Sequence, residues 1–265
     1  TSDLQNCSSG VVSRRHVQSS NALLLPVCDE ASEDLKKNIL QKMANDDIAD
    51  IVRTDGLIAQ FGSRLYMKNG HLVHRHQYIS QRIRELGRLV LGIAETTDKK
   101  SVKLSDYIKP SQFQCVVDSI HRVCGFDHQT HSYKIPSLSL KLGHSIKQCA
   151  EIIQAQSIMG EDRTRRDEAA DFIVLCKKQW KWKVSTHALT DLSHRKFNKP
   201  QRMPITEDIQ KLHAHLQRGA IDNAALLTVS PDADTWCTLA KIALCQTVLF
   251  NRRRGGEAER ITISQ

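Results

Sequence analysis

At 251–257 the chain reads Asn251-Arg252-Arg253-Arg254-Gly255-Gly256-Glu257. These residues follow an apolar run with helical character, 238–250, and precede a strand-like stretch, 260–263. The order predicts a buried helix that ends in an arginine, with a carboxylate three residues later and then a strand. A guanidinium keeps its proton and binds two phosphate oxygens in a fixed geometry, so Arg254 is a candidate for stabilising charge on a reacting phosphate.

A second informative stretch lies upstream. Residues 196–204 are basic and contain Pro200 and Pro204, which predicts a linker between two helical regions. The chain then continues Ile205-Thr206-Glu207-Asp208-Ile209, which predicts a helix with Thr206 as its N-cap.

In this order, the two stretches resemble the tyrosine recombinases (phage integrase family), in particular the transposon-borne eukaryotic members. The catalytic domain of that family typically opens with a phrase like Pro204 to Ile209. Its first catalytic box reads roughly Thr-Gly-Leu-Arg-x-x-Glu-Leu-x-x-Leu. Arg254 falls on the catalytic arginine and Glu257 on the glutamate, whereas 251–253 depart from Thr-Gly-Leu.

The polar, Ser-rich composition of the first residues predicts a flexible leader at 1–31. The resemblance implies a mainly α chain with a helical core-binding, DNA-binding domain at 32–195. A basic linker at 196–204 and the start of a catalytic domain at 205–265 complete the expected organisation. It implies DNA integration and recombination in the nucleus, double-stranded DNA as partner, a homo-oligomer on that DNA, and neither cofactor nor small-molecule substrate.

The remaining catalytic groups of the family all lie beyond the first box: a β-hairpin lysine, a His-x-x-Arg pair, a later His or Trp, and the nucleophilic tyrosine. The four tyrosines at 66, 78, 107 and 133 precede the box, and the sequence stops eight residues after Glu257. We therefore expect an incomplete catalytic domain that does not cleave DNA alone. Its apolar helix at 238–250 should have an unusually exposed face or be covered by the N-terminal domain.

Composition supports a polyanionic partner. The 265 residues carry a formal net charge of +9, with 40% apolar and 5% aromatic residues, enough for one large or two ordinary domains. Residues 53–90 hold seven Lys/Arg against two carboxylates, and 177–202 hold eight against one. These two segments carry +5 and +7, which favours a nucleic-acid surface over solvated helix faces. The predicted DNA contacts are Arg82, Arg84, Arg88, Lys181, Lys183, Lys196, Lys199 and Arg202.

Apolar periodicity predicts helices through most of the chain. Ser32 is the expected first cap. Residues 137–142 alternate like a strand, but the apolar pattern that follows favours a helix. A strand is expected only at 260–263, and a loop at 218–235. The expected helices are 32–43, 44–52, 55–67, 77–94, 110–125, 136–158, 164–182, 184–194, one from 206, and one from 235.

The eight cysteines include no CxxC pair, and several stand in apolar helical runs, which favours buried free thiols and a reducing, intracellular compartment. No run of about 18 apolar residues occurs, so no membrane span is expected. The first residues are not a signal peptide.

Two histidine groupings suggest metal ligands but are more often solvated or structural: His71 with His74 and His76, and Cys124 with His128 and His131. We predict no metal site. The run 180–183, Trp-Lys-Trp-Lys, fits a DNA-backbone contact and equally fits one tryptophan packed inward with solvated lysines.

Two alternatives to a recombinase remain open. One is a non-catalytic descendant that binds DNA as a regulator. The other is a helical protein-interaction module whose basic faces bind acidic proteins. A steep loss of affinity with salt distinguishes DNA binding from the second alternative.

Overall fold

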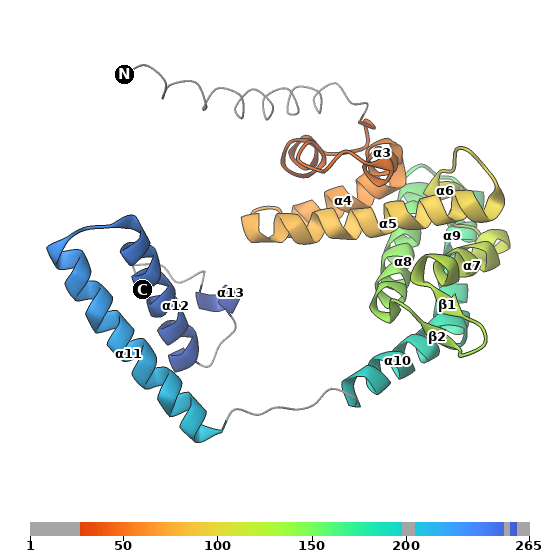
Figure 1. The fold of residues 1–265 in the computed structure, drawn as a ribbon. Helices are drawn as coiled ribbons and strands as arrows, with labels where there is room; N and C mark the ends of the chain where they lie inside the picture. Colours follow the sequence, from red (N-terminus) through yellow and green to blue (C-terminus); the bar gives the residue numbers. More distant parts are fainter. Residues whose placement is uncertain (1–26, 198–204, 252–254, 259–265) are drawn as a thin grey trace, which may run out of the picture. The chain divides into compact units, whose positions relative to one another are not determined.

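The computed structural model describes residues 27–197, 205–251 and 255–258 (Figure 1). Of these, 81% are helical and 2% are in strands, which confirms the mainly α fold class. The chain divides into two units, residues 1–198 and 199–265, and each is considered by itself.

Unit 1 begins earlier than the sequence predicts. Cys28 donates its backbone N–H to the carbonyl of Arg53, 2.8 Å away, and Ala31 is buried. The expected leader at 1–31 is therefore wrong for 27–31, while 1–26 lie outside the described residues. Ser32 caps the first helix by accepting the N–H of Leu35, as predicted.

The helices of unit 1 follow one another through short connections, with π-helical turns η1 and η4 and 3₁₀ turns η2 and η3 between them. They are α2 (Glu33–Leu35), η1 (Lys36–Leu40), α3 (Asp47–Thr54), α4 (Gly56–Asn69), η2 (Val73–Arg75), α5 (His76–Thr97), α6 (Leu104–Tyr107), η3 (Pro110–Gln112), α7 (Phe113–Cys124), α8 (Pro136–Met159), α9 (Arg163–Trp180), η4 (Lys181–Ser185) and α10 (Thr186–Phe197).

Helix α5 is the centre of unit 1 and packs against α3, α4, α7 and α8. Its inward face repeats at helical spacing through Ile79, Ile83, Leu86 and Leu89, all of them fully buried. This central position explains why the longest apolar periodicity in the N-terminal half belongs to α5.

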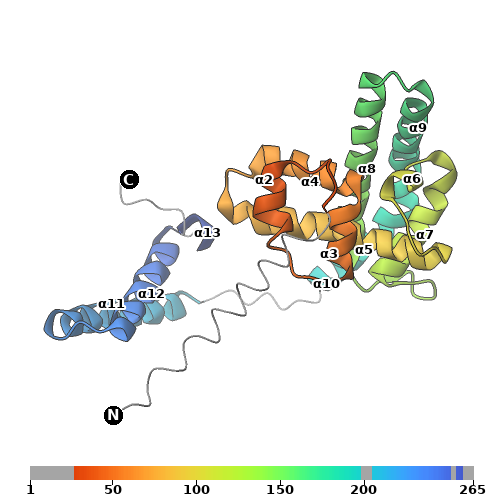
Figure 2. The same cartoon turned by 90° about the horizontal axis from the view of Figure 1, so that it is seen from above.

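Helices α8 and α9 form a long hairpin, seen side by side in Figure 2. Helix α8 confirms the helical choice at 136–158. The two helices approach closely where Gly143 faces the indole of Trp180, because a Cβ at Gly143 would lie 2.4 Å from Trp180 Nε1. Trp180 is buried and Trp182 is exposed, so one tryptophan of the run packs inward.

A small β-hairpin interrupts the helices, and the sequence did not predict it. Strands β1 (Phe126–Asp127) and β2 (Ser132–Tyr133) pair antiparallel, with Phe126 opposite Tyr133. The strand expected at 260–263 lies outside the described residues.

Unit 2 contains α11 (Thr206–Val229), α12 (Ala233–Asn251) and the short α13 (Gly255–Ala258). The predicted loop at 218–235 is wrong, because α11 continues to Val229 through a stretch rich in Ala and Leu that favours helix. The predicted Thr206 cap is also wrong: Ile205 occupies the N-cap position, with no side-chain cap hydrogen bond.

Part of the apolar surface of α12 is exposed, which is one of the two outcomes expected for 238–250: Leu244 and Phe250 are exposed, whereas Leu239, Ile242, Val248 and Leu249 are half-buried. Trp236 and Phe250 are 61% and 87% exposed, and Leu216 on α11 is the one buried hydrophobic residue in the described part of unit 2. A hairpin with so little buried surface is weakly stabilised by its own packing.

Candidate nucleic-acid interface

Arg82 is a correction to the predicted DNA contacts. It is only 5% exposed, and its Nη1 donates to Glu85 Oε2 at 3.0 Å. Its guanidinium also donates to the carbonyl of Lys141 and to the hydroxyl of Ser145 on α8. Position 82 lies one turn after Ile79 on the inward face of α5, so the side chain is unavailable to a phosphate.

The other two predicted contacts on α5 differ from each other. Arg84 is half-buried and donates to Asp46 Oδ1 at 3.1 Å, which anchors α5 to the start of α3. The hydrogen bond from Arg84 lowers the pKa of Asp46. Arg88 is exposed and makes no ion pair with any other described residue. Of the three, Arg88 is free to contact DNA.

The second group lies at the end of α9 and along η4 and α10. Lys181 and Lys196 are exposed, and Lys181 Nζ stands 5.5 Å from the ring centroid of Trp182. Lys183 is half-buried and donates to Gln114 Oε1 at 2.7 Å. Lys196 belongs to α10, so the predicted linker at 196–204 begins at least two residues too early. Lys199 and Arg202 lie outside the described residues.

Asp191 is the single carboxylate between Lys177 and Lys196, and it serves the fold. Its Oδ2 accepts the backbone N–H of Tyr133 at 2.6 Å. From the next turn of α10, Arg195 donates to the carbonyl of Tyr133 at 2.8 Å. Between Lys177 and Lys196 the exposed surface therefore presents lysines, and the one carboxylate of that stretch, Asp191, is hydrogen-bonded to the backbone; the nearest carboxylate of α9 is the exposed Asp171. We call the exposed lysines Lys177, Lys178, Lys181 and Lys196 the α9–α10 lysines.

Of the two residues that the resemblance assigns to catalysis, the structure describes Glu257 alone. Arg254 lies outside the described residues. Glu257 is exposed in α13 and has interactions of its own.

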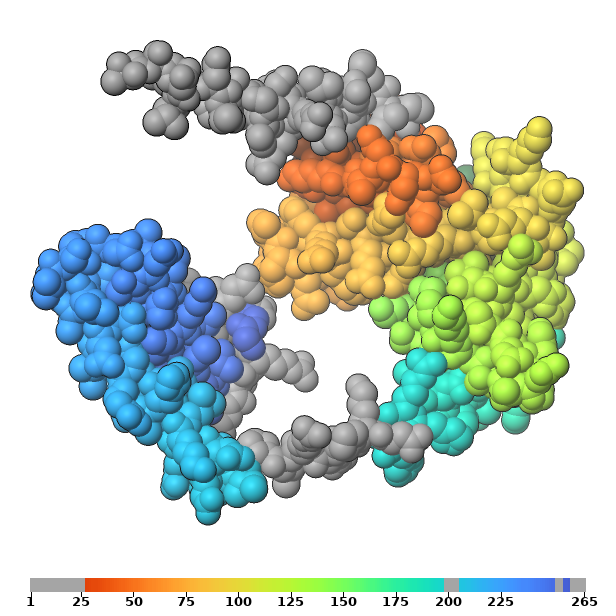
Figure 3. All heavy atoms as spheres, in the orientation of Figure 1, coloured from red at the N-terminus to blue at the C-terminus, as the bar shows by residue number. Residues whose placement is uncertain are grey.

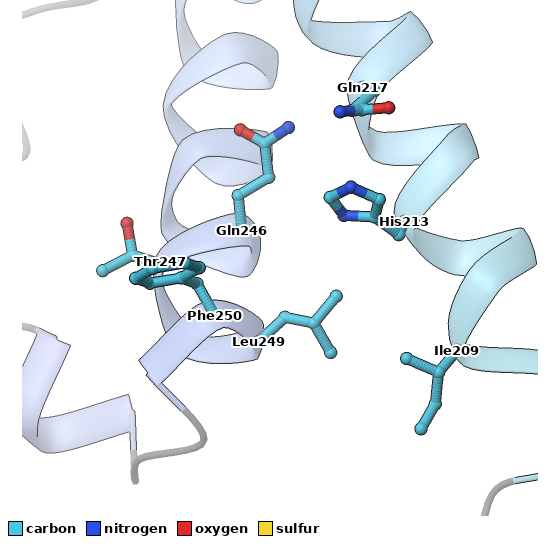
Figure 4. Close-up of a pocket in the computed structure, with 7 residues that line it drawn as sticks. All are labelled: Ile209, His213, Gln217, Gln246, Thr247, Leu249 and Phe250. Atoms are coloured by element: carbon cyan, nitrogen blue, oxygen red, sulfur yellow. The ribbon is translucent and has the colours of Figure 1, made fainter. Parts of the chain in front are cut away.

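A groove of about 990 Å³ lies between α11 and α12 in unit 2 (Figure 4). Ile209 and Leu249 point toward each other across it, with His213, Gln217 and Gln246 further along. Its lining contains no Lys, Arg, Asp or Glu. Such a groove suits apolar contact and not phosphate.

Of the histidines in the two metal hypotheses, His76, His128 and His131 pack or bond locally, and His71 and His74 are exposed. His76 Nε2 pairs with the carbonyl oxygen of Gly70 at 2.8 Å. Cys124 is buried, and that burial raises the pKa of its thiol to about 12, which disfavours the thiolate that a metal needs. Within the described part of the chain, no group of three His, Cys, Asp or Glu side chains is placed to hold a metal ion.

Sequence reasoning missed an aromatic cluster around the β-hairpin. Phe126 stacks on His121 with centroids 4.5 Å apart and lies 5.5 Å from His187 on α10. His131 stacks on His187 at 5.5 Å. Only tertiary structure brings these rings together, although the density of histidines at 121–131 was visible in the sequence.

No family model, no curated protein and no solved structure matches this chain. Among the described helices, none is long and apolar enough to cross a membrane.

Proposed function

We propose that this chain binds double-stranded DNA and that the α9–α10 lysines contact its phosphate backbone. The supporting observation is the exposed lysine surface between Lys177 and Lys196, a stretch whose one carboxylate, Asp191, accepts the backbone N–H of Tyr133. Lysine side chains that remain unpaired can neutralise phosphates and release counterions, which drives binding. The formal net charge of +9 acts in the same direction.

The resemblance of 204–257 to tyrosine recombinases supports a relationship to DNA breaking and rejoining enzymes. We propose that this chain retains DNA binding without cleaving DNA alone. An arginine at 254 stabilises charge on a phosphate, but it supplies neither a nucleophile nor a proton.

A salt titration tests the binding proposal. The logarithm of the association constant for a duplex should fall linearly with the logarithm of salt concentration. In Lys177→Gln/Lys178→Gln/Lys181→Gln, that slope should become shallower by about 0.9 for each phosphate that the protein no longer neutralises, or about 2.7 if all three lysines bind phosphates.

A matched control is Lys99→Gln/Lys100→Gln/Lys103→Gln, which removes the same charge from exposed lysines in the connection between α5 and α6. Asp98 and Asp106 flank these lysines, so we expect a smaller change in slope. Equal slopes for wild type and Lys177→Gln/Lys178→Gln/Lys181→Gln would exclude this surface as a contact for the DNA phosphate backbone.

Protein interaction is a second candidate function, favoured by the exposed apolar residues of unit 2. Ile205, Ile221 and Leu226 on or beside α11 and Trp236, Leu244 and Phe250 on α12 are all at least half exposed. Exposed apolar surface of this extent is typical of a partner interface. Binding through this surface would depend little on salt, and Trp236→Ser would weaken it while duplex binding stayed unchanged.

A further inference from the structure

The turn between α4 and α5 and the helical turns beside it carry exposed cations and no carboxylate of their own. No Asp or Glu occurs from Gly56 to Arg84. Within that span Arg64, Lys68 and Arg75 are exposed. None of the three forms an ion pair with another described residue, in contrast to Arg82 and Arg84.

The three cations are held on a well-defined support. Arg64 and Lys68 are four residues apart on α4, so they project from the same face about 6 Å apart along the axis. Arg75 closes η2, where its N–H bonds to the carbonyl of Leu72 at 2.8 Å. In Figure 1 this turn forms one free end of unit 1, and Figure 3 shows the same end of the unit in light orange.

Internal hydrogen bonds fix the turn itself. His76 Nε2 pairs with the Gly70 carbonyl oxygen at 2.8 Å, and the His76 ring lies 5.6 Å from the ring of Tyr66. The Tyr66 hydroxyl accepts from Asn38 Nδ2 at 2.8 Å, which ties α4 to η1. Because these hydrogen bonds order the turn without a ligand, binding should cost conformational entropy mainly in the long cationic side chains.

A fourth cation lies beside the turn. Lys42 is exposed and lines a hollow of about 250 Å³ together with Val73, His76 and Gln77. The rim of this hollow contains no carboxylate. Lys42 is the one Lys or Arg in this lining, which therefore favours an anion over a cation.

We propose that the α4–α5 turn, through Arg64, Lys68 and Arg75, is a second contact for the phosphate backbone of duplex DNA. The inference rests on the proposed DNA binding and adds a site to it. Duplex DNA fits better than an acidic protein because these cations need only a regular array of phosphates, and the hollow beside them is small and shallow.

The first test compares the salt dependence of duplex binding for wild type and Arg64→Gln/Lys68→Gln/Arg75→Gln. The slope should become shallower by about 2.7 if all three contact phosphates. The Lys99→Gln/Lys100→Gln/Lys103→Gln protein loses the same charge elsewhere and controls for the effect of net charge on DNA binding. Far-UV circular dichroism and thermal unfolding check that each variant is folded.

The second test detects the contact directly. Met67, which is 83% exposed between Arg64 and Lys68, is replaced with the photocrosslinking residue p-benzoylphenylalanine. Met159, which is 76% exposed at the end of α8 beside Glu161 and Asp162, is the matched control site. Irradiation with labelled duplex should give an adduct at 67 and none, or far less, at 159.

The outcomes separate the two proposals. If wild type fails to bind duplex DNA, the proposed function is wrong and the turn has no DNA to contact. If wild type binds with a steep salt dependence, while the turn variant keeps the wild-type slope and position 67 gives no adduct, only the second contact is overturned. Retention of an acidic protein by the turn without duplex binding would identify the other class of partner.

Discussion

Asp191 on α10 holds the backbone of Tyr133 in the β-hairpin, with 2.6 Å between Asp191 Oδ2 and the Tyr133 nitrogen. The two residues are 58 positions apart in sequence. The only carboxylate of the 177–202 segment thereby joins two elements of the fold.

Asp191→Ala should destabilise unit 1 by about 1–3 kcal/mol, because the Tyr133 N–H loses its acceptor in a largely buried place. Urea unfolding measures the change in the free energy of unfolding. Asp191→Asn keeps an acceptor oxygen and should recover most of the loss. Equal destabilisation by Ala and Asn would show that charge, and not the hydrogen bond, holds the hairpin.

Arg82→Ala should cost about 3–5 kcal/mol, because it leaves Glu85, only 2% exposed, without its arginine inside unit 1. Arg88→Ala, two turns further at an exposed position of α5, should change stability by no more than about 0.5 kcal/mol. Paired urea titrations measure both. A mild effect at 82 would mean that Lys141 alone compensates Glu85.

The apolar periodicity of the sequence was sufficient to predict a helix and its core positions where that helix has one buried face. Ser32 was recognisable as a cap, and the apolar repeat of α5 identified its core positions. The same pattern could not reveal that Arg82 lies on the buried face, because a guanidinium is compatible with either side until its partner is known. Glu85 stands three residues later, a spacing equally typical of an exposed pair.

The β-hairpin was missed for a different reason. Each of its strands has only two residues, too short for an alternating pattern, and Asp191 and Arg195 hold it from α10. The contact surface that we propose at Arg64, Lys68 and Arg75 was visible in the sequence as a cluster of positive charge. The sequence could not show that Arg82 and Arg84 are the poorer candidates, because their ion pairs with Glu85 and Asp46 form only in the packed structure.

Gly143→Ala should destabilise unit 1 by about 1–3 kcal/mol, since the added Cβ would lie 2.4 Å from Trp180 Nε1 and force α8 and α9 apart. Gly160→Ala, after the end of α8, meets only the Gln156 carbonyl oxygen at 3.3 Å and serves as the control. Thermal unfolding followed by tryptophan fluorescence compares the two. A stabilising effect of Gly143→Ala would contradict this close approach of α8 and α9, because it would show that the interface accommodates an extra methyl group.

The chain should form no covalent link to DNA. Tyr133 is buried, and burial raises the pKa of its hydroxyl, which disfavours the nucleophilic phenolate. Incubation with supercoiled and nicked DNA, followed by denaturing electrophoresis, would detect an adduct. A phosphotyrosine at any of positions 66, 78, 107 or 133 would overturn both the mapping of Arg254 and the expectation of inactivity.

The free energy of unfolding should fall as pH decreases from about 6.5 into the acid range, partly because of His121. Burial lowers the pKa of this imidazole in the folded protein, against an unfolded value of about 6.5. Between the folded and unfolded pKa values the unfolded chain binds the extra proton, so stability is fully present above the window and is lost as pH falls.

Several groups act on His121. His128 and His187 lower its pKa further, while Asp118 and a hydrogen bond to the Lys183 carbonyl raise it. Urea unfolding from pH 5 to 7.5 should give a smaller pH dependence for His121→Asn than for wild type. The control is His144→Gln, at an exposed position of α8, which should keep the wild-type dependence. If His121→Asn also keeps it, protonation of His121 does not control the acid sensitivity of unit 1.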